Sequence, residues 1–244
     1  GYGQTAYLTS TSKSEIGQSL GMWYMYKMLG IFQSQEEINS YKNADGKVIQ
    51  PNALPGDIKY DDYNGDGQIS SEDRQIVGNP WPKLEMGFNF SASWRGIDFA
   101  LNSYGRFGQE VYNGAAYAAG DFQNNQNNFK GIVPWTQEHP VNDRPRIVYG
   151  DSRNTRGDQD RWLEDGSFFR ISDITLGYSL PTRAIRKIGL EKVRFAVTGK
   201  NLVTFTKYSG LDPEFADGGI WTIGYDGCSF PNPRAVQFAV SLTF

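Results

Sequence analysis

Strict alternation of apolar and polar residues predicts β-strands at several places along the chain. It is clearest over residues 84–94, where apolar side chains fill every second position and Glu, Gly, Asn or Ser fill the others. Residues 235–244 repeat the pattern. Because successive side chains of a strand point to opposite faces, each segment has one apolar side and one polar side. The main apolar positions are Leu84, Met86, Phe88, Phe90 and Trp94 in the first segment, and Phe238, Val240 and Leu242 in the last.

Breaks in the alternation predict how these strands are connected. Arg95-Gly96 separates two alternating runs, which predicts a hairpin with a very short turn. Within residues 168–180 the apolar positions change phase at Ser172-Asp173, which predicts a β-bulge. Residues 31–41 predict one short helix, because Ser34 is a suitable N-cap and a glutamate follows three residues later.

The connections between the predicted strands alternate between short and long. The short ones are 95–96 and 181–191, and the long ones are 105–165 and 206–233. Bacterial outer-membrane barrels have short periplasmic turns and long extracellular loops, whereas a β-sandwich has no reason to sort its loops by end. A strand of about 11 residues also has the length of a tilted membrane strand.

These patterns predict an all-β fold made of antiparallel strands of a large transmembrane β-barrel in the bacterial outer membrane. Residues 1–83 are expected to supply a strand end and an extracellular loop, and residues 84–244 the carboxyl-terminal strands with their long loops. The apolar positions named above are expected to face lipid, and the polar positions the lumen. The final aromatic residue, Phe244, is expected to act as a terminal signal for barrel assembly.

Composition narrows the class of protein further. The chain is 14% aromatic with 28 glycines, which favours strands and turns, and no apolar run approaches the roughly 20 residues of a membrane helix. The net charge of −3 provides no excess of basic residues to bind phosphates, so we do not expect nucleic acid as a partner. Cys228 is the only cysteine, which excludes an intrachain disulfide. Since Gly1 begins no export signal, we expect a mature or partial chain, in particular a carboxyl-terminal fragment.

The sharpest local motif is the acidic loop of residues 62–73. Oxygen-bearing side chains recur at its first, third, fifth, ninth and twelfth positions, with glycine at the sixth, as in an EF-hand-type calcium loop. The loop departs from that pattern at its last position, where aspartate replaces the usual glutamate. We expect a Ca²⁺ site that serves as a structural staple, and the alternative is a metal-free cluster of Asx turns. The candidate ligands are Asp62, Asn64, Asp66, Gln68 through its backbone carbonyl, Ser70 and Asp73.

Aromatic residues in the long loops are candidates for contact with a substrate or a partner protein. The alternative is that they pack the loops against one another. The candidates are Tyr112, Trp135, Trp221 and Tyr225. The sequence has no recognisable nucleophile–base pair or phosphate-binding loop, and its only histidine, His139, stands beside a proline in a polar segment. We therefore do not expect an enzyme.

Seven short motifs occur in an order that resembles one family. They lie at residues 30–33, 55–57, 62–67, 76–80, 169–178, 198–202 and 208–214. With the terminal phenylalanine, the ordered set resembles the carboxyl-terminal part of SusC/RagA-type TonB-dependent transporters of the Bacteroidetes outer membrane. The resemblance runs over almost the whole chain, and residues 1–29 match it least.

This resemblance implies a barrel of about 22 strands with an amino-terminal plug and a TonB box, of which the chain would supply roughly the last five to seven strands. It also implies a SusD-like surface lipoprotein over the extracellular loops and an energy supply through TonB. The cargo implied is an oligosaccharide or an oligopeptide, and the sequence does not choose between them.

A second hypothesis is a secreted calcium-binding β-sandwich that binds carbohydrate. In that case Trp81, Trp135 and Trp221 would serve as stacking platforms. The two hypotheses differ in where the apolar sides of the strands lie. A sandwich buries them in a closed interior, whereas a barrel leaves them exposed to lipid.

Overall fold

The computed structural model describes residues 6–120, 129–148, 153–186, 189–215, 219 and 222–244. The chain divides into two compact units, each built from segments that are distant in the sequence. The first unit comprises Gly1–Trp81, Glu110–Glu164 and Ala216–Cys228. The second unit comprises Pro82–Gln109, Asp165–Phe215 and Ser229–Phe244.

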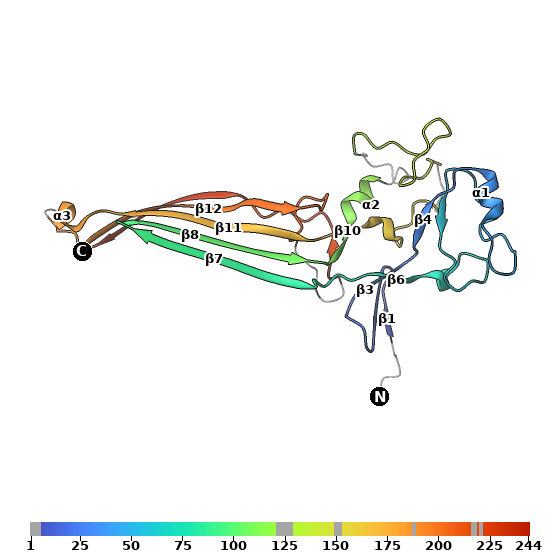
Figure 1. The fold of residues 1–244 in the computed structure, drawn as a ribbon, viewed down its shortest axis with the longest axis horizontal. Coiled ribbons are helices and arrows are strands. Elements are labelled where there is room, and N and C mark those ends of the chain that lie inside the picture. Colours follow the sequence, from blue (N-terminus) through green and yellow to red (C-terminus); the bar gives the residue numbers. More distant parts are fainter. Residues whose placement is uncertain (1–5, 121–128, 149–152, 187–188, 216–218, 220–221) are drawn as a thin grey trace. The chain divides into compact units, whose positions relative to one another are not determined.

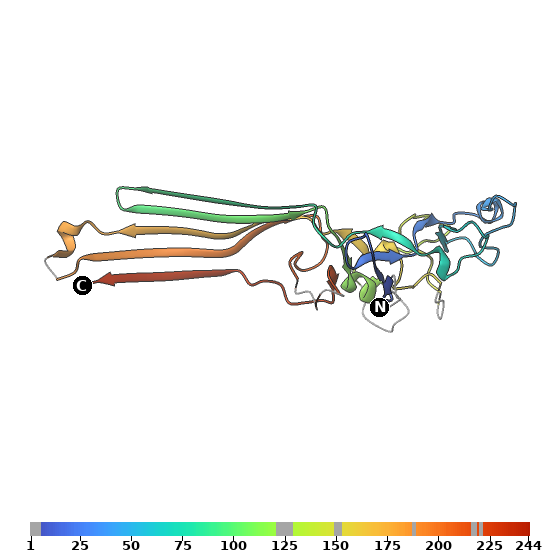
Figure 2. The same ribbon diagram turned by 90° about the horizontal axis from the view of Figure 1, so that it is seen from below.

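The second unit is built on a five-stranded antiparallel sheet, whose strands run side by side in Figures 1 and 2. Its order is β14-β12-β11-β8-β7. The strands are β7 (Leu84–Trp94), β8 (Ile97–Phe107), β11 (Phe168–Ser179), β12 (Lys192–Thr206) and β14 (Ala235–Thr243). A short helix, α3 (Thr182–Ile185), lies in the connection between β11 and β12.

The first predicted strand and its turn are confirmed residue for residue. β7 spans Leu84–Trp94 and pairs with β8 through a two-residue turn. Both turn residues have positive φ, 48° at Arg95 and 87° at Gly96, which is the backbone that type I′ hairpin turns require. This turn matches the right-handed twist of the flanking strands, so it fixes their register.

The predicted bulge is also present, and it keeps the apolar side chains of β11 on one face. The register of β11 against both β8 and β12 shifts between Ile171 and Asp173. The extra residue changes the phase of alternation, so Ile171 before the shift and Ile174 after it point to the same side of the sheet.

The first unit holds small sheets and the cores of the structure. One sheet has the order β1-β2-β3-β6, a second β10-β9-β13, and β4 pairs with β5. These strands are β1 (Ala6–Leu8), β2 (Ser12–Glu15), β3 (Met22–Met25), β4 (Met28–Ile31), β5 (Ile58–Tyr60), β6 (Gln75–Gly78), β9 (Glu110–Asn113), β10 (Leu163–Asp165) and β13 (Tyr225–Asp226). The helical turns are α1 (Gln35–Ser40), η1 (Ser71–Asp73), α2 (Gly114–Gly120) and η2 (Asp160–Trp162).

Two predictions from the sequence, a short helix and a long loop, can be compared with elements of the first unit. The predicted short helix is α1, and the Ser34 side chain accepts a hydrogen bond from the Glu37 N–H as an N-cap should. Residues 105–165, expected as one long loop, contain the end of β8 together with β9, α2, η2 and β10. The short elements carry no alternation long enough to show in the sequence, because two to four strand residues are too few for a period.

Among the described residues, three clusters of buried apolar side chains lie within the first unit. One contains Trp23, Met25, Tyr112 and Trp162; the next contains Tyr26, Ile31, Ile58 and Tyr60; the third contains Phe32, Ile38 and Ala53. In the second unit β7 is exposed along its whole length, as is nearly all of β14. No helix among the described residues is long and apolar enough to cross a membrane.

Candidate functional site

One face of the five-stranded sheet is apolar across all of its strands. The register places Trp94, Ile97, Tyr178, Phe195 and Val240 in one row. The next row on the same face contains Ala92, Phe99, Leu176, Val197 and Phe238. Since pairing partners in neighbouring strands point to the same side, the apolar positions predicted from β7 and β14 share one continuous surface.

This apolar face is exposed rather than packed in an interior. The apolar positions singled out from the sequence are all exposed, and Phe238 is 80% exposed. Monomeric soluble proteins rarely leave a continuous apolar surface of this kind uncovered. The β-sandwich hypothesis requires a second sheet packed on this face, and the described residues of the second unit form a single sheet.

The opposite face of the sheet carries polar and charged pairs. Arg106 of β8 forms an ion pair with Glu85 of β7 at 2.9 Å, and the hydroxyls of Thr175 and Thr198 lie 2.9 Å apart. The sheet therefore has one apolar and one polar face, as a barrel wall between lipid and lumen requires.

A further ion pair on the polar face joins two strands, β8 and β12, that are separated by a third. The Arg194 Nε of β12 donates to the Asp98 Oδ1 of β8 at 2.9 Å, although β11 lies between those two strands. The intervening residue of β11 is Gly177, and a Cβ there would overlap both charged groups. Glycine is therefore what allows this pair to form.

The most buried charge in the second unit is Arg170 of β11, whose side chain points to the polar face. It is 2% exposed and binds Asp212 and Glu214 in the segment after β12, with Nη1 2.7 Å from the Glu214 Oε2. Its Nε donates to the Thr204 hydroxyl at 3.0 Å. Every side of this guanidinium is thus satisfied, as a buried cation requires.

The Asp212 and Glu214 carboxylates also bind residues 229–234, the segment that leads back into β14 and is here called the returning chain. The Asp212 carboxylate accepts hydrogen bonds from the Glu214 N–H and the Asn232 N–H, both at 2.9 Å. The Asn232 side-chain amide donates to Glu214 at 3.2 Å. Arg170, Asp212 and Glu214 lie inside motifs that carry the family resemblance, but nothing local in the sequence shows that Arg170 meets residues about forty positions away.

The predicted calcium loop folds as a set of Asx turns closed by a capping box. The Asp62 carboxylate accepts from the N–H groups of Gly65 and Gly67, at 3.0 and 2.9 Å. The Asp73 carboxylate is fully buried and accepts from the N–H groups of Asn64 and Ser70, at 3.4 and 2.6 Å.

Backbone N–H groups thus occupy much of the acceptor capacity of the candidate ligands. Asp66 Oδ1 accepts from the Gln68 N–H at 2.8 Å, and Asn64 Oδ1 accepts from the Asp66 N–H at 2.9 Å. Within the described residues no three Asp, Glu, His or Cys side chains converge as a metal site would require. The geometry is that of the Asx-turn alternative, and Ca²⁺ binding stays a prediction.

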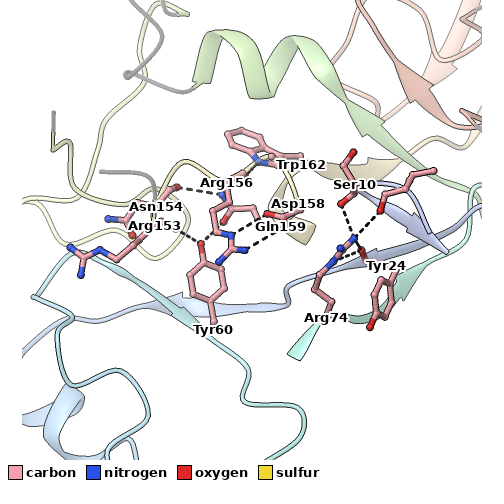
Figure 3. A network of polar contacts seen from close by, with 12 residues as sticks. Ser10, Tyr24, Tyr60, Arg74, Arg153, Asn154, Arg156, Asp158, Gln159 and Trp162 are labelled. Atoms are coloured by element: carbon pink, nitrogen blue, oxygen red, sulfur yellow. Dashed lines mark hydrogen bonds and ion pairs between the residues drawn. The ribbon is translucent and has the colours of Figure 1, made fainter. Parts of the chain in front are cut away.

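A polar network in the first unit fixes the segment 153–162 against β5 (Figure 3). The Tyr60 hydroxyl lies 2.6 Å from the Arg153 carbonyl oxygen and 3.1 Å from the Gln159 Oε1. The Trp162 indole and the Gln159 amide both donate to the Arg156 carbonyl, at 2.8 and 2.7 Å. These contacts run largely to backbone atoms, so their role is to position the segment.

Two neighbouring groups complete that network. Arg74, the residue before β6, donates to the carbonyl oxygens of Tyr24 and Ser10, both at 2.7 Å (Figure 3). It thus ties the start of β6 to β3 and to the turn between β1 and β2. Burial raises the pKa of the Asp160 carboxyl, while the Met28 N–H that it accepts at 2.8 Å works in the opposite direction. The hydrogen bonds described for Arg74 and Asp160 go to backbone atoms, so both groups serve to position the chain.

The aromatic candidates from the loops have different surroundings. Tyr112 is only 2% exposed, so its assignment as a contact residue is corrected: its ring packs in the core beside Trp23, and burial raises the pKa of its hydroxyl. Trp135 is partly buried against the second core cluster, and its indole donates to Gln33 at 2.8 Å. Tyr225 stacks on Tyr112 with the ring centroids 5.0 Å apart, and it is 38% exposed. Trp221 lies outside the described residues.

Sequence comparison finds TonB-dependent receptors. Receptor P26 of Formosa agariphila is 34% identical over 239 residues, which cover 94% of this chain and 23% of the receptor. Receptor SusC of Bacteroides thetaiotaomicron is 28% identical over 203 residues, which cover 81% of this chain and 18% of SusC. The matched part of the chain therefore spans about a fifth to a quarter of the length of these relatives. No family model matches the chain.

Structural comparison finds the same kind of protein. The structure of the RagAB peptide transporter matches with a TM-score of 0.74 and 20% identity, over 100% of this chain and 25% of that chain. The RagAB peptide importer in its open-open state matches with a TM-score of 0.72 and 21% identity. The predicted fold and the predicted resemblance are both confirmed, and the barrel is not closed by the strands of this chain alone.

Proposed function

We infer that this chain is a segment of a SusC/RagA-type TonB-dependent receptor, and we propose that the whole protein imports oligosaccharides or oligopeptides across the bacterial outer membrane. The observation that carries the proposal is the two-sided sheet: an exposed apolar face continuous over five strands, opposite a face of ion pairs and hydroxyls. The apolar positions listed from β7 and β14 face lipid in this proposal, and the polar positions line the lumen.

The relatives support the remaining parts of the proposal. Their names describe receptors and transporters, so we propose no catalytic activity. TonB-dependent receptors draw energy from TonB, and we propose that TonB engages the whole protein outside this segment. We further propose that a SusD-like surface lipoprotein covers the extracellular loops, with exposed aromatic rings such as Tyr225 available for contact. Phe244 is proposed as a barrel-assembly signal.

The test uses the intact protein, tagged in the organism that makes it. We expect it in the outer-membrane fraction, resistant to alkaline extraction, and co-purifying with a surface lipoprotein in detergent. Deleting its gene should abolish growth on one class of oligomer, which pools of oligosaccharides and of oligopeptides identify, while growth on the corresponding monomer continues. Recovery of the protein in the aqueous fraction would contradict the proposal.

We also propose that residues 62–73 bind Ca²⁺ as a structural staple. The support is the sequence pattern of oxygen ligands around a loop that the Asx turns already shape. Asp66→Asn is the sharpest variant, because Asn retains the oxygen that accepts from the Gln68 N–H. It removes the charge and the second oxygen, which accepts only a long, exposed hydrogen bond of 3.3 Å from the Asn64 amide.

The measurement is limited proteolysis of the intact receptor with excess Ca²⁺ or with a chelator. We expect Ca²⁺ to slow cleavage near the loop about tenfold or more in the wild type, because binding stabilises the bound state by mass action. Asp66→Asn should lose most of that protection and behave as wild type in chelator. Equal protection with and without Ca²⁺ in the wild type would favour the metal-free Asx cluster.

A further inference from the structure

The segment that follows β12 does not extend away from the sheet. Residues 207–215, here called the strap, return over the polar face, because Asp212 and Glu214 both bind Arg170 in the neighbouring strand β11. Arg170 shares that face with Asp98 and Arg194, as the register of β11 shows. The strap therefore lies on the side of the sheet opposite the apolar face.

Several contacts make the strap a fixed element. Its Tyr208 is buried, with the ring 6.3 Å from that of Phe215, and the Tyr208 N–H donates to the Thr206 hydroxyl at 3.1 Å. The returning chain before β14 is fastened to the strap through Asn232 and to β12 through Asn201, whose amide donates to the Pro233 carbonyl at 3.2 Å.

A cavity of about 500 Å³ remains between the strap, β12 and the returning chain. Its walls include Thr204 and Thr206 from β12, Leu211 and Asp212 from the strap, and Asn232 and Arg234 from the returning chain. The strap thus stands away from the strand rather than filling the space against it.

We propose that the strap narrows the passage beside β11 and β12, and that the Arg170 cluster sets how far it reaches into the lumen. This inference rests on the proposed function, since it takes the polar face as the lumen wall. Without Arg170, the Asp212 and Glu214 carboxylates would lose their only cation in the cluster and keep only neutral hydrogen-bond donors. Two negative charges held against the sheet without a counter-ion are costly, so we expect the strap to move them away from the sheet into water. Arg170 is therefore a positioning residue for the strap.

The first test measures hydrogen exchange in the purified intact receptor. Arg170→Met keeps an unbranched side chain and removes the charge. We expect amide exchange in the strap and at Asn232 to accelerate on the order of a hundredfold. Arg194→Met is the matched control, because it breaks another ion pair on the same face that holds no strap. Unchanged strap exchange in Arg170→Met, or equal acceleration in both variants, would overturn the proposal.

The second test asks whether the strap restricts access to the wall. Thr204→Cys, made in the intact receptor with Cys228 and any further cysteines replaced by serine, keeps a weak acceptor for the Arg170 Nε at position 204. Its thiol should react with a small maleimide but slowly with a bulky one, and Arg170→Met should bring the two rates together. If the strap is released and the bulky reagent still reacts slowly, the strap does not narrow the passage. If the Arg170→Met receptor fails to assemble, Glu214→Gln removes only one of the two ion pairs of the cluster. We expect its strap exchange and its labelling rates to lie between those of the wild type and those predicted for Arg170→Met.

These outcomes are separate from failure of the proposed function. Exchange and labelling report on the strap in the purified protein, whatever cargo it carries. Localisation outside the outer membrane would remove the proposed function, whereas unchanged exchange in a correctly localised Arg170→Met protein would remove only the strap proposal.

Discussion

Phe238→Arg is expected to destabilise the intact receptor in a bilayer by about 2–4 kcal/mol, the cost of arginine on the lipid side of a barrel near the midplane. Phe238 lies in the middle of β14 and is 80% exposed on the apolar face. In water this substitution would cost little, since exposed surface changes usually do. The expected loss therefore depends entirely on lipid covering that face.

Gln237→Arg is the matched control for this substitution. Gln237 is the adjacent residue of the same strand, and it pairs with Thr198 on the polar face. We expect a change within about 0.5 kcal/mol. Denaturant-induced unfolding from lipid vesicles, followed by the heat-modifiable migration of the folded barrel, compares the two variants. Equal losses, or a larger loss for Gln237→Arg, would contradict the assignment of the two faces.

Trp23→Ala is expected to cost about 3–5 kcal/mol of stability in the first unit, as is usual when a buried tryptophan is truncated. Trp23 is 2% exposed, its ring lies 6.0 Å from that of Tyr112, and its indole donates to the Glu110 carbonyl at 2.7 Å. The substitution leaves a cavity in the first core cluster and an unpaired carbonyl on β9.

Trp81→Ala separates burial from hydrogen bonding in that prediction. The Trp81 indole also donates to a backbone carbonyl, that of Leu20 at 2.8 Å, but the side chain is 40% exposed. We expect a loss of about 1 kcal/mol, close to that of one hydrogen bond. Pulse proteolysis of the intact receptor across a denaturant series measures both variants in the first unit. Similar losses would mean that Trp23 contributes through its hydrogen bond rather than its packing.

The long strands could be predicted from the sequence because their determinants are local. Alternation over Leu84–Trp94, the turn at Arg95-Gly96 and the phase change near Ser172 each lie within a few consecutive residues. The N-cap at Ser34 is local in the same sense. Such features follow from backbone geometry, which a short window of sequence specifies.

The unpredicted features depend on contacts between distant residues. Arg170 reads as one polar residue within a strand, and only the fold shows that Asp212 and Glu214 surround it. Tyr112 reads as a loop aromatic, but it pairs in strand β9 and packs into a core assembled from three stretches of chain. Helix α2 begins and ends with glycine and shows no capping signal.

The glycine between Asp98 and Arg194 has a consequence for how the sheet assembles. In the native alignment Gly177 opens a gap through which two strands that never touch share a charge pair. A slip of one residue by β11 would bring a bulky neighbour, Leu176 or Tyr178, into that gap and separate the charges. The Asp98–Arg194 ion pair thus forms only when β8, β11 and β12 are all in the native register. An assembly intermediate with β11 out of register lacks this ion pair and has a bulky side chain between the two charges, which disfavours it relative to the native register.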